Sequence, residues 1–210
     1  MPEPSSRLPN LPRREFLARK GGTMNRHSLR GGTPARIAAS ALLCGLLVSC
    51  GGDNGVVEPD PPASLADLLG TVFHKADGSS VGIEAVEGKA LVAIYFSARG
   101  CPACGAFTPL LLDAYADLKE AGRSFEVVLV SFESSAEDMF TYMTDLGMPW
   151  LAVPFGGEKA QAITLRYGVR WIPTLVVVNS QGETVSITGR EDVAAKGAGA
   201  YEDWLANSGG

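Results

Sequence analysis

Short apolar runs alternate with stretches of helical periodicity along residues 65–206. Three of the runs, residues 90–96, 125–132 and 174–179, are rich in aliphatic and aromatic side chains and carry a single charge among them. Such runs predict strands that are buried on both faces. Residues 105–121, which follow the first run, have apolar side chains at intervals of three and four and predict an amphipathic helix. Strands that alternate with helices predict an α/β fold, with a mixed sheet covered on both faces.

Shorter apolar runs at both ends of this region predict two hairpins. Residues 71–74 and 81–83 flank Asp77-Gly78-Ser79, which is a turn signal. Near the other end, residues 180–183 turn the third buried strand into a partner strand at 184–188. The sheet is therefore expected to begin with one hairpin and to end with another.

Three further helices are predicted by caps and periodicity. Ser134 and Ser135, followed by two acidic residues, predict a capped helix that continues to about residue 146. Residues 158–167 predict a helix closed by a glycine, and residues 198–206 predict the last helix.

The corner between the first buried strand and its helix carries Cys101-Pro102-Ala103-Cys104. This places Cys101 near the helix N-terminus, where free N–H groups and the helix dipole favour a thiolate. Cys104 lies one turn inside the helix, close enough to form a disulfide with Cys101. One activated sulfur that attacks and a second that resolves the mixed disulfide are the parts of a thiol–disulfide exchanger.

The 210-residue chain has a formal charge of −5, but the charge is unevenly distributed. Residues 1–50 carry 8 Lys and Arg against 2 Asp and Glu, whereas residues 51–210 carry 10 against 21. The later part is therefore acidic and has no basic stripe for phosphates, which argues against a nucleic-acid partner.

The N-terminal region has the pattern of an export signal. Residues 1–36 are basic, and the twelve apolar residues 37–48 are too few to span a bilayer, which needs about 20. The run ends in Leu47-Val48-Ser49-Cys50, which resembles the bacterial lipobox, in which the cysteine is lipidated and becomes the mature N-terminus. We therefore predict a signal region at 1–49, a flexible Gly- and Pro-rich linker at 50–64, and a folded domain at 65–210.

Two details refine this prediction. Arg13-Arg14 resembles a twin-arginine signal but lies about 20 residues before the apolar run, and Met24 opens a compact signal peptide of its own. Met24 is therefore favoured as the true start. Cys44 is interpreted as a small apolar residue of the signal. The lipobox resemblance implies a lipoprotein anchored through Cys50 on the periplasmic side of the cell envelope, and Gly51 after it favours the outer membrane.

The domain resembles the thioredoxin fold, in its tryparedoxin and nucleoredoxin branch. The resemblance covers about residues 65–206, and the blocks that carry it are Tyr95-Phe96-Ser97-Ala98, Cys101-Pro102-x-Cys104, Phe107-Thr108-Pro109-Leu110, Met148 to Phe155, Tyr167-Gly168-Val169 and Ile172-Pro173-Thr174-Leu175. It implies a three-layer α/β/α sandwich, with a mixed central sheet and an N-terminal β-hairpin.

The same resemblance assigns roles to residues. Cys101 matches the nucleophile, Cys104 matches the resolving cysteine, and the two match the family's redox disulfide. Pro173 matches a cis-proline that faces the dithiol, and it leaves the backbone of Ile172 free to pair with an extended substrate. Trp171 is expected either to line the substrate groove or only to pack.

Three positions depart from the family. Gly100 replaces the tryptophan that usually precedes the first cysteine, which predicts a more open site. Tyr95 occupies the position of a buried acid in many thioredoxins, as it does in the tryparedoxin-like branch. Gly105 stands where a basic residue is common, and Arg99 is expected either to supply positive charge instead or to point into solvent.

The expected function is a thiol–disulfide oxidoreductase that needs no cofactor, acts on protein thiols and disulfides, and is preferably reductive, fed by a membrane electron donor. The sequence leaves alternatives open. A copper- or metal-handling module would use Cys101, Cys104 and His74. A thiol peroxidase and a non-catalytic lipoprotein of the same fold also remain possible readings of these residues.

Overall fold

A computed structural model describes residues 62–209. The predicted signal region, the start at Met24, the lipidation site Cys50 and residues 50–61 of the linker lie outside the described residues.

The described residues form a seven-stranded mixed sheet in the order β2-β1-β5-β4-β3-β6-β7. At its centre β3 pairs in parallel with β4 and antiparallel with β6. The strands are β1 (Val72–His74), β2 (Ser80–Gly82), β3 (Leu91–Ser97), β4 (Phe125–Ser131), β5 (Leu151–Ala152), β6 (Thr174–Asn179) and β7 (Thr184–Ser186).

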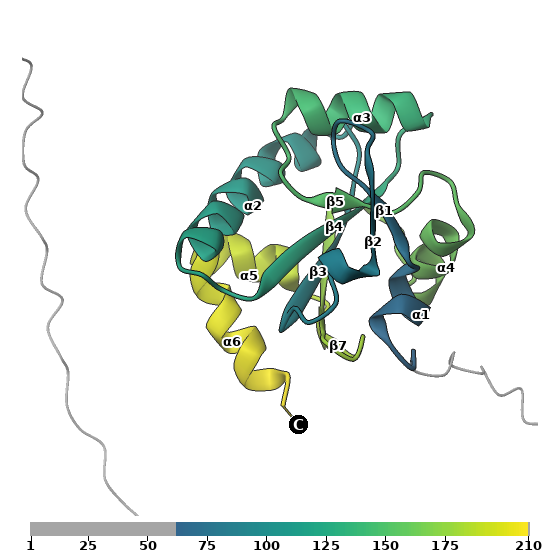
Figure 1. Cartoon of the computed structure of the whole chain (residues 1–210). Coiled ribbons are helices and arrows are strands. Elements are labelled where there is room, and N and C mark those ends of the chain that lie inside the picture. Colours follow the sequence, from purple (N-terminus) through teal and green to yellow (C-terminus); the bar gives the residue numbers. More distant parts are fainter. Residues whose placement is uncertain (1–61, 210) are drawn as a thin grey trace, which may run out of the picture. The chain divides into compact units, whose positions relative to one another are not determined.

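Helices cover both faces of this sheet, as Figure 1 shows. Helices α2 (Pro102–Glu120), α3 (Ala136–Asp145), α5 (Gly189–Lys196) and α6 (Ala200–Asn207) pack on one face. Helices α1 (Leu65–Leu69) and α4 (Glu158–Arg166) pack on the other. Short 3₁₀ turns lie at Ile83–Ala85 and Gly197–Gly199.

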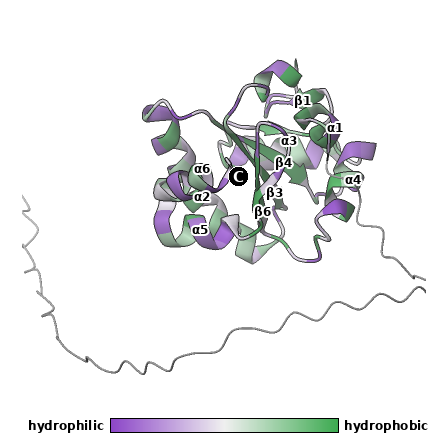
Figure 2. Cartoon of the chain, turned by 90° about the horizontal axis from the view of Figure 1, so that it is seen from below, coloured by the Kyte–Doolittle hydropathy of each residue, from purple (hydrophilic) through white to green (hydrophobic). Residues whose placement is uncertain are grey.

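Successive side chains of the central strands point to opposite faces of the sheet, and this alternation explains why the domain has one core on each face. On β3, Ala93 and Tyr95 belong to the core under α2, whereas Val92, Ile94 and Phe96 belong to the core under α1 and α4. The residues of β3 are therefore buried throughout, which is why its sequence is a continuous apolar run. Figure 2 shows hydrophobic colour along the central strands, whereas the surrounding helices carry both hydrophobic and hydrophilic colours.

The predicted fold class is confirmed: the domain is a three-layer α/β fold with helices on both faces of a mixed sheet. The first hairpin forms where the turn signal predicted it, and β7 forms the predicted partner of β6. The predicted last helix at 198–206 is confirmed as α6, whereas α5, which precedes it, was not predicted. The short helix α1 was not predicted.

None of the helices between residues 62 and 209 is both long enough and apolar enough to cross a bilayer.

Candidate active site

Cys101 is the N-cap residue of α2. Its backbone is extended, with φ −97° and ψ 111°, and Pro102 begins the helix with the φ that a first turn requires. The N–H of Cys104, free of an intrahelical partner at this end, donates to the Cys101 sulfur at 3.2 Å. A backbone donor and the positive end of a 19-residue helix therefore face this sulfur, and both favour its thiolate.

The loop before β6 meets Cys101 from the opposite side. The Cys101 thiol donates to the carbonyl oxygen of Ile172 at 3.5 Å. The bond between Ile172 and Pro173 is cis, which confirms the prediction for this proline. Thr174, the first residue of β6, is paired with Phe96 near the end of β3, and this register brings the two loops together.

The two thiols differ in their access to solvent. Cys101 is partly exposed, whereas Cys104 is fully buried. Burial raises the pKa of the Cys104 thiol, a hydrogen bond with Cys101 raises it further, and a hydrogen bond with Ser97 opposes both. Both cysteines are free thiols in the structure, and their disulfide stays a prediction.

Four buried hydroxyls surround Cys104 on its inner side. Thr108, one turn further along α2, donates to the Cys104 carbonyl oxygen at 2.8 Å and lies 2.8 Å from the Tyr95 hydroxyl. Ser97 lies 3.0 Å from Tyr95 and 2.8 Å from the hydroxyl of Tyr142 on α3, which is itself 3.3 Å from Thr108. We call these four side chains the hydroxyl network. Burial raises the pKa of Tyr95 far above its usual value, so the Tyr95 hydroxyl keeps its hydrogen.

Sequence reasoning identified only Tyr95 in this network. Ser97, Thr108 and Tyr142 come from a strand end, a helix interior and a second helix, and they form no motif along the chain. The one available signal was the location of Ser97 and Thr108 inside blocks that resemble the family.

Trp171 lies directly before Ile172 and is 83% exposed, so the expectation that it only packs is wrong. Trp150 and Trp204 are buried. The Arg99 guanidinium forms an ion pair with Asp145 on α3, and the Arg99 backbone N–H donates to Glu133. The positive charge of Arg99 is therefore directed at a carboxylate rather than left in solvent.

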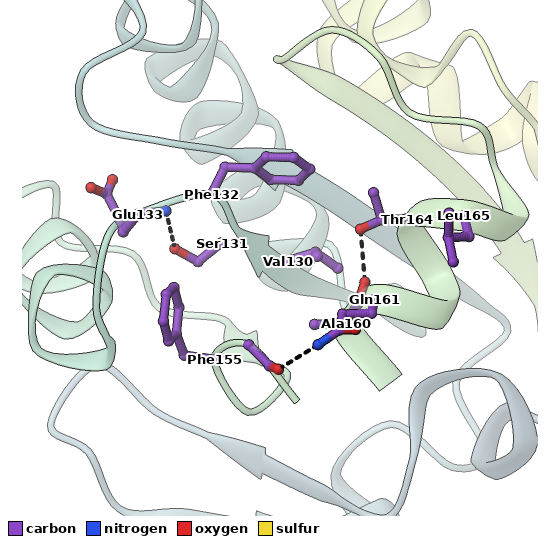
Figure 3. Close-up of a pocket in the computed structure, with 10 residues that line it drawn as sticks. Val130, Ser131, Phe132, Glu133, Phe155, Ala160, Gln161, Thr164 and Leu165 are labelled. Atoms are coloured by element: carbon purple, nitrogen blue, oxygen red, sulfur yellow. Dashed lines mark hydrogen bonds between the residues drawn. The ribbon is translucent and has the colours of Figure 1, made fainter. Parts of the chain in front are cut away.

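A hollow of about 470 Å³ lies at the same edge of the sheet. In Figure 3, Thr164 and Leu165 come from α4, and Phe132, in the loop directly after β4, lines the hollow with Phe155. Its lining includes neither cysteine, but Glu133 connects it to the loop before Cys101 through Arg99. An open, largely apolar surface therefore adjoins the dithiol.

His74 lies in the first hairpin, where its ring nitrogen is 3.2 Å from the Ser80 hydroxyl and its ring packs edge-on against Phe140. Within residues 62–209, no group of three His, Cys, Asp or Glu side chains is gathered in a way that could hold a metal ion.

Comparisons with known proteins agree with this fold. A family model described as thioredoxin-like matches residues 88–184. The solved thioredoxin from Wuchereria bancrofti is 34% identical, with a TM-score of 0.56, over 70% of this chain and 100% of that one. Tryparedoxin I from Leishmania major is 30% identical, with a TM-score of 0.56, over 62% of this chain and 89% of that one.

Nucleoredoxin from Bos taurus is 36% identical over 150 residues, which is 71% of this chain and 34% of the relative. The chain thus spans about a third of the length of that nucleoredoxin. Together, the fold, the dithiol and these similarities show that the chain belongs to the thioredoxin-like family, with nucleoredoxins and tryparedoxins among its relatives.

Proposed function

We propose that this protein is a thiol–disulfide oxidoreductase that exchanges disulfides with protein substrates through Cys101 and Cys104. The observation that carries the proposal is the position of the Cys101 sulfur, partly exposed, 3.2 Å from the N–H of Cys104 and 3.5 Å from the Ile172 carbonyl oxygen. A sulfur held in this way has a backbone N–H donor that stabilises its thiolate and an open side for a substrate.

In the first step, the Cys101 thiolate attacks one sulfur of a substrate disulfide. A bond forms between Cys101 and that sulfur, the substrate S–S bond breaks, and the second substrate sulfur leaves as a thiolate that takes a proton from solvent. The backbone of Ile172 faces this point, and it is placed to pair with an extended substrate segment as an added strand would.

In the second step, Cys104 attacks the Cys101 sulfur of the mixed disulfide. The disulfide between Cys101 and Cys104 forms, the bond to the substrate breaks, and the substrate sulfur leaves with a proton. The substrate disulfide is thereby reduced to two thiols, and the two cysteines of the protein are oxidised. The reverse sequence would introduce disulfides into a substrate.

The exposed surface beside the dithiol supports a protein substrate rather than a small disulfide alone. Trp171 is directly adjacent to Ile172, and the hollow beside Phe132 and Leu165 offers further apolar contact area. Exposed aromatic side chains next to apolar hollows are typical of surfaces that bind other proteins.

We also propose that the protein acts in the cell envelope, facing the periplasm, and that lipid on Cys50 anchors it in the outer membrane. The lipobox-like Leu47-Val48-Ser49-Cys50 and the linker at 50–64 support this. Reduction, supplied by a membrane electron donor, is the proposed direction. A redox titration tests it, because a potential near about −270 mV is that of a reductant and one near about −120 mV is that of an oxidant.

Reduction of insulin by dithiothreitol, followed as turbidity, tests the exchange activity. The chain is expected to accelerate the reaction, and the Cys101→Ser variant is expected to lose the acceleration entirely. Unchanged acceleration by Cys101→Ser, with the fold intact by circular dichroism, would remove the role assigned to this cysteine.

A further inference from the structure

The hydroxyl network beneath Cys104 has a fixed direction of hydrogen donation, because each hydroxyl has one hydrogen. Thr108 donates to the Cys104 carbonyl oxygen, which can only accept, so Tyr95 is the donor to Thr108 at 2.8 Å. Ser97 donates to Tyr95 at 3.0 Å, so Tyr142 is the donor to Ser97 at 2.8 Å. Tyr142 also lies 3.3 Å from Thr108, and we assign its single hydrogen to the nearer Ser97 oxygen. The hydrogens then run from Tyr142 through Ser97 and Tyr95 to Thr108.

This direction determines what Ser97 can offer to the neighbouring Cys104 sulfur. While its hydrogen is directed to Tyr95, the Ser97 oxygen can accept the hydrogen of the Cys104 thiol. When Cys104 loses its proton, the Ser97 hydroxyl has to turn from Tyr95 to the sulfur to stabilise the negative charge. Tyr95 therefore competes with the Cys104 sulfur for the same hydrogen.

Tyr142 acts on Ser97 in the opposite sense. Its donation at 2.8 Å draws electron density from the Ser97 oxygen, which makes Ser97 a stronger donor and a weaker acceptor. Both effects favour the Cys104 thiolate over the thiol.

The titratable groups that face Cys104 are Cys101 on its own helix, Tyr95 on β3 and Tyr142 on α3. Among the described residues, no carboxylate contributes to the environment of the Cys104 thiol. Neutral donors, not a buried acid, therefore lower the pKa of the Cys104 thiol, through a hydrogen bond with the Ser97 side chain and a smaller contribution from the Ala98 backbone.

We propose that Ser97 stabilises the Cys104 thiolate as it attacks the mixed disulfide, and that Tyr142 and Tyr95 tune this donation in opposite directions. The role of Ser97 in this attack rests on the proposed exchange function. In that step the bond between the two cysteine sulfurs forms and the bond from Cys101 to the substrate sulfur breaks. The proton lost by Cys104 ends on the departing substrate thiolate, so no additional base is needed. Ser97 is the residue proposed to donate to the reacting sulfur, and the two tyrosines are positioning residues.

The test titrates Cys104 directly in the full-length chain, with Cys44, Cys50 and Cys101 each replaced by serine. Carbon-13 labelling of the remaining cysteine then gives one Cβ resonance whose shift follows the thiol. This titration needs no substrate, so it remains decisive even if the protein fails to reduce insulin and the proposed function is wrong.

Ser97→Ala is expected to move the Cys104 titration to higher pH by about one unit or more, as expected for a lost hydrogen bond to a charged group. Ser97→Thr, which keeps a hydroxyl, is expected to bring the midpoint most of the way back to the wild-type value. Tyr142→Phe is expected to raise the titration midpoint and Tyr95→Phe to lower it. The control is Tyr115→Phe, a buried tyrosine on α2 whose hydroxyl bonds to Glu126 instead, and it is expected to leave the midpoint unchanged.

Opposite shifts from the two network tyrosines support the proposal, because loss of packing or stability alone gives no reason for opposite signs. Shifts of the same sign, or no shift beyond that of Tyr115→Phe, would overturn it. If Ser97→Ala fails to fold, the two phenylalanine variants decide the question, since each removes a single oxygen atom.

Discussion

The Cys101 thiol lies 3.5 Å from the carbonyl oxygen of Ile172, although the two residues are 71 positions apart in the chain. The antiparallel pairing of β3 with β6, with Phe96 opposite Thr174, brings the loop that leaves β3 against the loop that enters β6. The N-terminus of α2 therefore presents its sulfur to the Ile172 backbone, which we propose binds the substrate. The proposed exchange chemistry depends on this relationship.

Replacing Gly100 with tryptophan is expected to narrow access to Cys101 without unfolding the protein. A Cβ atom at Gly100 would meet no heavy atom within 4 Å, and this glycine is not among those with positive φ, so a side chain can be added without strain. We expect alkylation of Cys101 by iodoacetamide to slow several-fold. The unfolding free energy is expected to stay within about 0.5 kcal/mol of the wild type. An unchanged alkylation rate would show that position 100 does not cover the thiol.

Trp171→Ala is expected to weaken the binding of protein substrates while leaving the fold intact. The side chain is 83% exposed, so its loss creates no cavity, but exposed tryptophans beside a reaction centre often contribute more than 1 kcal/mol to binding. We expect KM for insulin to rise about five- to tenfold with little change in kcat. Reduction of a small disulfide such as oxidised glutathione should be less affected.

Leu205→Ala serves as the control for Trp171→Ala. Leu205 is also partly exposed, but it lies on α6, whose neighbouring Trp204 stacks on Phe125 at the start of β4, the end of that strand away from the dithiol. Its replacement should leave KM unchanged. An equal rise in KM for both variants would contradict a specific role for Trp171.

The reduced protein is expected to lose stability at alkaline pH through Cys104. Burial raises the pKa of this thiol above that of an unfolded chain, about 8.5, so the folded state favours the protonated form. The contribution is complete below the unfolded pKa and is lost as pH rises through the folded one, at up to about 1.4 kcal/mol per unit between the two. Urea unfolding at about pH 8 and about pH 10 should therefore show a steeper loss for the reduced wild type than for Cys104→Ser. Equal losses in both proteins would contradict this account.

Lipidation of Cys50 is tested in a bacterial host. The wild-type chain is expected to incorporate labelled palmitate and to sediment with membranes, because acyl chains contribute about 0.8 kcal/mol for each buried CH₂ group. Cys50→Ser should lose both properties, and Cys44→Ser should lose neither. Labelling that persists in Cys50→Ser would show that this cysteine is not the acylated residue.

Much of the fold could be predicted from the sequence because its central strands are buried on both faces. The runs that became β3, β4 and β6 are too uniformly apolar to be surface elements, and the turn signal at residues 77–79 marked the first hairpin. The helices α1 and α5 were missed for physical reasons. The first is only five residues long, and α5 begins with a glycine and buries only Gly189 and Val193, so it has no clear apolar stripe.

The candidate site was predictable only in part. Cys101 and Cys104 are visible as a motif, because two residues three positions apart share one helical turn. The hydroxyl network was not visible, since Ser97, Thr108 and Tyr142 become neighbours only when α2 and α3 pack on β3. Common residues on separate elements form such contacts through tertiary packing, for which the local sequence has no signature.

The most direct test of the central claim is to determine which sulfur attacks a substrate. The Cys104→Ser variant is incubated with insulin, and the products are analysed by mass spectrometry before and after reduction. The account predicts a covalent adduct through Cys101 that dithiothreitol releases, and no adduct with Cys101→Ser. An adduct formed through Cys104 in the Cys101→Ser variant, or none in Cys104→Ser under conditions where the wild type reduces insulin, would contradict it.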